Sequence, residues 1–135
     1  MKTTNITYLP KEVLIIENDR ILSIPYFEIK IITCDKPYIL VETISKKYHL
    51  SQNLSGFCAG LPSFIMQSDK STYINLLQIT AIHKSKSGYT ARIQGASYSI
   101  SRRRIAEIKV NFLKIKTKSI EAGNCHICMN CKTTV

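Results

Sequence analysis

The chain has 135 residues, enough for one domain with a modest core, and its 44% hydrophobic and 21% charged residues exclude a disordered protein. Its 19 Lys and Arg against 9 Asp and Glu give a net charge of +10 at pH 7, which favours a polyanionic partner, nucleic acid before an anionic membrane. The longest apolar runs are far shorter than the ~20 residues that span a bilayer, and no signal peptide is recognisable. The sequence therefore predicts a cytoplasmic protein with reduced cysteines.

The first half of the chain predicts short strands. Residues 27–31 alternate between apolar and polar side chains with the period of two that is typical of a strand. Polar turns separate the apolar segments at Asn18-Asp19, at Asp35-Lys36-Pro37 and at Ser45-Lys46-Lys47. The strands predicted in this way cover residues 14–17, 20–24, 27–34 and 38–43.

A short amphipathic helix is expected over residues 50–61. Its apolar stripe consists of Leu50, Leu54, Phe57 and Leu61, at spacings of four, three and four. Ser51 is the expected N-cap, and the Gly60 to Pro62 segment ends the helix.

Strand signals return in the second half, where the predicted strands cover residues 64–66, 73–82, 89–93 and 98–100. The polar stretch 67–71 interrupts the first two of them. Hairpin turns are expected at Ser87-Gly88 and at Gly95-Ala96.

A final helix is expected to begin after the N-cap Ser101 and to end at about Lys116. Its apolar stripe consists of Ile105, Ile108, Phe112 and Ile115. Three arginines in its first turn oppose the helix dipole, which makes this helix start a natural place for a bound phosphate. Residues 117–135 are expected to form a loose tail.

The segment from Phe64 to Asn75 resembles the motif of the LytTR DNA-binding domain, F-x-x-x-x-[HKR]-[KR]-S-[YF]-[LI]-[VI]-N. Lys70, Ser71, Ile74 and Asn75 are in register with that motif. The family continues with a glycine-containing hairpin and a Ser-Arg-Arg sequence that opens the last helix, as residues 88 and 101–104 do here. This chain departs from the family motif at three positions, where it has Gln67, Asp69 and Thr72.

The resemblance implies a mainly β fold with short helices, an elongated bundle of β-strands with a C-terminal helix. It divides the chain into an N-terminal extension (1–19), a LytTR-like domain (20–116) and a flexible cysteine-containing tail (117–135). Because about 20 residues precede the domain, the expected protein is a response regulator-like transcription factor that stands alone, without a receiver domain.

The resemblance also implies that loops enter the major groove of double-stranded DNA and thereby regulate transcription in a bacterium. Two copies are expected on repeated DNA sites. Lys46 and Lys47 are expected to be merely solvated, and Asn75 either reads a base or closes a turn through its own backbone. The residues expected at DNA are Lys36, Lys70, Asn75, Arg102, Arg103 and Arg104, of which Arg102 and Arg104 are expected at phosphates.

The C-terminal cysteines Cys125, Cys128 and Cys131 have a C-x2-C-x2-C spacing that could hold zinc or an iron–sulfur cluster. The fourth ligand would have to come from Cys34, Cys58, His49 or a second chain. The alternative is a reduced tail without metal. Elsewhere no cofactor is expected.

Two other classes of function compete with DNA regulation. One is a basic β-domain that binds RNA or a protein partner, with the cysteine tail as a metal or redox sensor. Readers of single-stranded RNA usually display aromatic platforms, whereas the seven tyrosines and four phenylalanines here lie mostly among apolar strand residues. The other is an enzyme, which the scarce acids, three scattered histidines and missing nucleophile motif argue against.

Overall fold

The computed structural model describes residues 4–126, with side chains for residues 4–118. In this part of the chain the elements follow in the order β1 (Thr4–Tyr8), β2 (Glu12–Glu17), β3 (Arg20–Pro25), η1 (Tyr26–Glu28), β4 (Ile29–Asp35), β5 (Tyr38–Thr43), β6 (Lys47–Leu50), α1 (Leu54–Cys58), β7 (Ile65–Asp69), β8 (Thr72–Asn75), η2 (Leu76–Gln78), β9 (Ala81–Ser85), β10 (Gly88–Ile93), β11 (Ala96–Ile100) and α2 (Arg102–His126).

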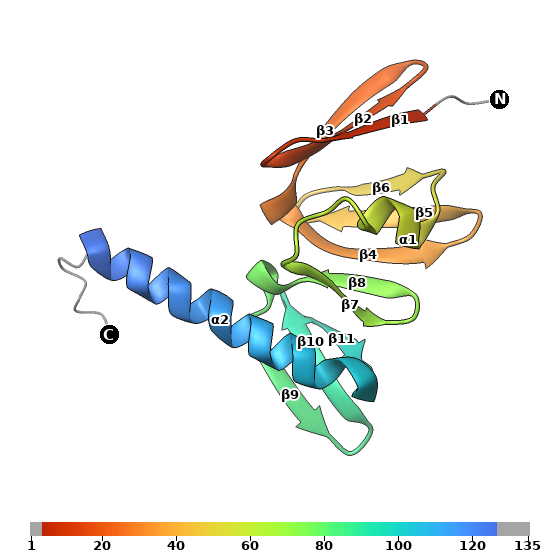
Figure 1. Ribbon diagram of the computed structural model, residues 1–135. Helices are drawn as coiled ribbons and strands as arrows, with labels where there is room; N and C mark the ends of the chain where they lie inside the picture. Colours follow the sequence, from red (N-terminus) through yellow and green to blue (C-terminus); the bar gives the residue numbers. More distant parts are fainter. Residues whose placement is uncertain (1–3, 127–135) are drawn as a thin grey trace.

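The strands form three antiparallel sheets that follow one another along an elongated molecule (Figure 1). The first sheet has the order β1-β2-β3, the central sheet β6-β5-β4-β8-β7, and the last sheet β11-β10-β9. Helix α2 lies across the last sheet, and its C-terminal part extends beyond the strands (Figure 1). The expected fold, a β-strand bundle with a C-terminal helix, is confirmed.

The central sheet takes part in both apolar cores of the domain. One core joins it to the first sheet and α1, and includes Ile32 and Val41. The other joins it to the last sheet and α2, and includes Ile31 and Ile74. The consecutive Ile31 and Ile32 are both buried because they face different cores, and a register shift between Ile29 and Ile31 marks a bulge that puts Ile29 in the same core as Ile32.

The first sheet is attached to the central one through Tyr8. The Tyr8 hydroxyl donates to the Phe57 carbonyl at 2.6 Å, and the aromatic rings of the two residues lie 6.2 Å apart. A Cβ at Gly60 would come within 2.5 Å of the Tyr8 ring, so this approach requires glycine. Residues 4–17, expected in an extension, thus form β1 and β2 and pack on the domain.

Both expected hairpins of the last sheet are present. Gln94 (φ 48°) and Gly95 (φ 84°) connect β10 to β11, and Lys86-Ser87 connect β9 to β10. Consecutive positive φ values are typical of the two-residue turns that match the twist of antiparallel strands.

Four local predictions are wrong. The strand expected over residues 73–82 is divided by η2 into β8 and β9. Helix α1 covers only residues 54–58, and Asn53 rather than Ser51 caps it by accepting from the Gly56 amide at 2.8 Å. Residues 26–28 form η1, so the strand expected from Phe27 begins at Ile29. The polar stretch expected to interrupt the strands does not end β7, which continues to Asp69. Ser68 is buried there, and its hydroxyl donates to the Thr72 carbonyl of the paired strand.

Helix α2 begins at Arg102 as expected but continues to His126, so its predicted end at about Lys116 is wrong. The sequence from 117 to 122 contains no proline or glycine that would stop a helix. The first ten residues of the expected tail are therefore helical.

The attachment of α2 to the last core depends on Ile108, which is fully buried. We expect Ile108→Ala to lower the free energy of unfolding by about 2–5 kcal/mol, since it leaves a cavity. Val110→Ala, on the exposed side of the same helix, should change the free energy by less than about 0.5 kcal/mol. Denaturant titrations of both variants measure the difference, and equal effects would contradict this packing.

Candidate nucleic-acid interface

Three segments with exposed cations lie along one side of the molecule: the β4–β5 turn, the β7–β8 turn and the start of α2 (Figure 1). Lys36 belongs to the first segment, Lys70 to the second, and Arg102 and Arg103 to the third. All four side chains are exposed. The predicted contact residues therefore form a row, with Lys36 and Lys70 on two turns of the central sheet and Arg102 and Arg103 at the start of the helix.

The β7–β8 turn and the start of α2 are held together by two hydrogen bonds. The Ser101 amide donates to the Ser68 carbonyl at 2.8 Å, and Arg104 Nη2 donates to Gln67 Oε1 at 2.8 Å. These bonds fix the helix start against the edge strand of the central sheet.

The side chains of this junction surround one shallow hollow, which brings the Lys70 ammonium and the arginines of α2 to a single site. Its lining residues are Gln67, Asp69, Lys70, Ser101, Arg103 and Arg104. Arg104 is partly buried and bonded to Gln67, so it differs from its exposed neighbours Arg102 and Arg103. Gln67 is not among the residues that the sequence predicts at DNA, although its departure from the family motif is a signal that could have identified it.

The turn that carries Lys70 is closed by its own side chains. Asp69 Oδ1 accepts from the Ser71 amide at 2.9 Å, and a second register shift lies between Gln67 and Asp69. Lys70 lies at the tip of this tight turn, and its side chain is exposed to solvent. Ser71 therefore has a structural role in this turn.

The start of α2 combines charge with free backbone donors. The first amides of a helix have no intrahelical acceptor, and the helix dipole is positive there. Arg102 and Arg103 add two exposed guanidinium groups to that field, with no acidic residue in the first turn. The site suits an anion such as a phosphate.

The turn that carries Lys36 lies on a neighbouring part of the central sheet. Beside it, His49 Nε2 and Asp35 Oδ2 are 3.1 Å apart, and the Tyr38 and His49 rings meet edge to face. These contacts tie β6 to the β4–β5 turn and hold the base of the Lys36 loop.

Asn75 does not belong to this surface, which corrects the expectation that it contacts DNA. Its side chain is completely buried, and its Nδ2 donates to the carbonyls of Tyr26 (3.0 Å) and Ile29 (2.8 Å). Its Oδ1 accepts from the Leu77 amide at 2.8 Å. Both side-chain polar atoms of Asn75 are thus engaged: Oδ1 closes the local turn at Leu77, and Nδ2 joins β8 to η1 and the start of β4.

The expected metal site cannot be placed. Cys128 and Cys131 lie outside the described residues, as does the side chain of Cys125. Among the fourth ligands considered, Cys58 is buried and its burial raises the pKa of its thiol to about 12, while His49 pairs with Asp35. Within the described residues, no group of three or more His, Cys, Asp or Glu could hold a metal ion.

None of the helices in the described part of the chain is long and apolar enough to cross a membrane. The lysines outside the row, Lys46 and Lys47, are exposed at the β5–β6 turn, on a different part of the central sheet.

Three stacked sheets with cationic loops along one side define a binding domain whose candidate site is a row of turns. The sequence profile of the LytTr DNA-binding domain matches residues 19–113, more than half of the chain, so the chain belongs to this family. The resemblance that we noted in the sequence is confirmed.

The structure is similar to that of the LytTr DNA-binding domain of a protein described as a methyl-accepting/DNA response regulator from Bacillus cereus. The TM-score is 0.64 at 16% sequence identity, over 78% of this chain and 98% of that chain. At this identity the similarity shows the fold. A comparison with curated proteins finds no match.

The structural role of Asn75 can be tested directly. We expect Asn75→Ala to lower the free energy of unfolding by at least about 2 kcal/mol, because two buried carbonyls and one partly buried amide lose their partner. Asn111→Ala is a matched control, since Asn111 bonds only one carbonyl on the surface of α2. If thermal and denaturant unfolding showed Asn75→Ala to be as stable as Asn111→Ala, the structural role would be refuted.

Proposed function

We propose that this protein binds double-stranded DNA in a sequence-specific manner and regulates transcription in the cytoplasm of a bacterium. The single observation that supports this best is the row of exposed cations on three turns of a LytTR-family domain. In this proposal the turns enter the major groove, and no recognition helix is required.

The roles of the cations follow from their surroundings. Lys70 and Arg103 flank the same hollow and are exposed, so we assign them to base edges, where a lysine or arginine donates to guanine N7 and O6. Lys36 is assigned to the part of the major groove next to the one that Lys70 and Arg103 contact. Arg102 is assigned to a phosphate beside the start of α2.

Arg104 has a positioning role in this proposal. Its bond to Gln67 holds the β7–β8 turn against α2, so that Lys70 and Arg103 keep a constant separation. Its remaining guanidinium donors still face the hollow and can bond a phosphate.

The proposed site is repeated DNA with two copies of the protein bound. One row of turns covers only a short segment of duplex, so two copies on adjacent segments would supply the specificity that one copy lacks. The role is one of binding and not of catalysis, and it requires no cofactor.

RNA binding is the alternative that the sequence left open, and the arrangement of the sheets argues against one form of it. Readers of single-stranded RNA stack bases on aromatic side chains of an open sheet face. In the described residues, the central sheet packs on apolar cores through both faces and offers no such platform.

The proposal predicts a repeated sequence motif in a selection from random duplex DNA. We expect Lys70→Ala and Arg103→Ala each to reduce affinity for the selected site by about 5- to 150-fold, the equivalent of about 1–3 kcal/mol, and to relax the preference at one base pair. Fluorescence anisotropy with the selected site and its single-base variants measures both effects.

Lys118→Ala is the charge-matched control, because Lys118 lies in the C-terminal half of α2, away from the three turns. It should leave the preference unchanged. An equal, sequence-independent loss in all three variants, or selection of arbitrary DNA, would contradict base reading by Lys70 and Arg103.

Arg102 should behave differently from Arg103. Because a phosphate contact contributes counterion release, we expect Arg102→Ala to weaken binding to all sequences alike and to reduce the slope of log K against log salt by about 0.9. Titrations at several salt concentrations measure the slope. An unchanged slope together with altered base preference would reverse the assignment of the two arginines.

A further inference from the structure

Helix α2 has a second apolar face that the domain does not cover. Val110 is 52% exposed and Leu113 is 62% exposed, although both are large aliphatic residues. They lie on the side of the helix away from Ile108 and Phe112, which pack on the last core. Exposed aliphatic residues on one helix face are typical of a binding surface.

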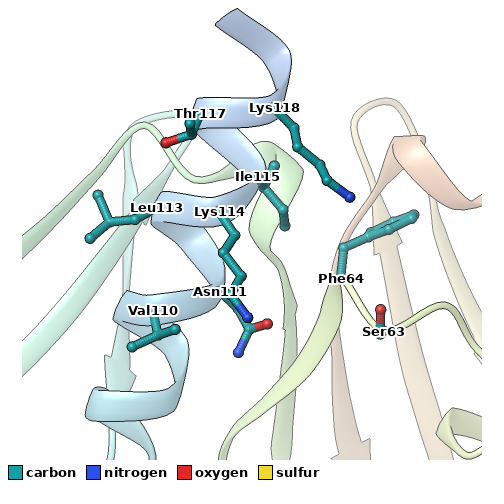
Figure 2. Close-up of a pocket in the computed structure, with 9 residues that line it drawn as sticks. All are labelled: Ser63, Phe64, Val110, Asn111, Leu113, Lys114, Ile115, Thr117 and Lys118. Carbon is teal, nitrogen blue, oxygen red and sulfur yellow. The ribbon is translucent and has the colours of Figure 1, made fainter. Parts of the chain in front are cut away.

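A groove runs beside this face (Figure 2). It has a volume of about 640 Å3, and Phe64 forms its opposite wall, facing Ile115 and Lys118 across the gap. Val110 and Leu113 lie on the part of the helix turned away from Phe64. The helix therefore presents an apolar ridge next to a groove with an aromatic wall.

The ridge has the spacing that another helix recognises. Val110, Leu113 and Thr117 are separated by three and four residues, so they lie above one another on one face of α2. An amphipathic helix docks on such a surface with its own side chains at positions i, i+3, i+4 and i+7.

Charge determines which kind of helix fits. Between residues 102 and 118 the single acidic residue of α2 is Glu107, whereas its cations are Arg102, Arg103, Arg104, Lys109, Lys114, Lys116 and Lys118. Lys114 and Lys118 line the groove itself. A second copy of α2 would bring the same lysines against these, while an acidic helix would neutralise them.

We propose that this surface, formed by the ridge of Val110, Leu113 and Thr117 and by the groove beside Phe64, docks an acidic amphipathic helix of a partner protein. The apolar side of that helix lies on the ridge, and its carboxylates face Lys114 and Lys118. The ridge lies in the middle of α2, whereas Arg102 and Arg103 lie in its first turn, so a partner can bind while DNA is bound. The inference does not depend on the proposed DNA binding.

Selection from a display library of random 20-residue peptides against the full chain tests this proposal without a known partner. We expect peptides that are acidic and carry apolar residues at helical spacing. Their affinity should fall at least tenfold with Leu113→Asp and with Lys114→Glu, and should fall as salt is raised. Ile21→Asp and Lys86→Glu are the matched controls, because Ile21 is 68% exposed on β3 and Lys86 is exposed in the β9–β10 turn.

Circular dichroism and thermal melts establish that the variants fold. Recovery of no peptides, of peptides without acidic residues, or of peptides insensitive to both α2 variants would overturn the proposal. A dimer in sedimentation velocity that Leu113→Asp dissociates would assign the surface to a second copy instead. Binding that appears only after Ile127→Ser and Met129→Ser would assign it to the chain's own C-terminus. Both of these results also overturn it.

Discussion

The burial of the central sheet on both faces is the constraint on which the rest of the structure depends. Ile32 and Val41 face one core, while Ile31 and Ile74 face the other. Ordinary alternation places Ile31 and Ile32 on opposite faces of β4, and the bulge before Ile31 places Ile29 in the same core as Ile32. Because both faces of this sheet are largely covered, the exposed cations of the candidate site lie at its turns and at the start of the helix that follows the last sheet.

A row of turns can read a rigid partner only if the turns keep their spacing, and the bonds between β7 and α2 provide that rigidity. Ser101 and Ser68 join the backbones, and the Arg104 side chain joins Gln67. The buried Asn75 does the same for the opposite end of the hairpin, where β8 passes into η2. Rigid elements are generally better than free loops at holding recognition groups in a fixed geometry. The polar residues Gln67, Ser68 and Asn75 therefore fix the positions of the exposed cations near them.

Much of this architecture could be predicted from the sequence because it depends on local signals. Alternation, turn residues and the stripe of Ile105, Ile108 and Phe112 identified most strands and the start of α2. The row of cations was also predictable, since each cation lies in a turn or at the start of α2. What sequence could not show is which polar residue points inward. Asn75 and Ser68 have ordinary surface residue types, and only the packing of distant segments buries them.

The length of α2 was missed for a related reason. A helix without a proline or glycine continues until something stops it, and the sequence contains no such signal before Gly123. The consequence is functional, because the same helix carries arginines at its start and, beginning two residues after Ile108, the ridge of Val110, Leu113 and Thr117. Ile108 anchors the helix between these two regions and is fully buried, so a partner on the ridge can affect the arginines only by moving α2 as a whole. Contact with β7 through Arg104 opposes such movement, and the two surfaces are therefore expected to work independently as long as that contact is kept.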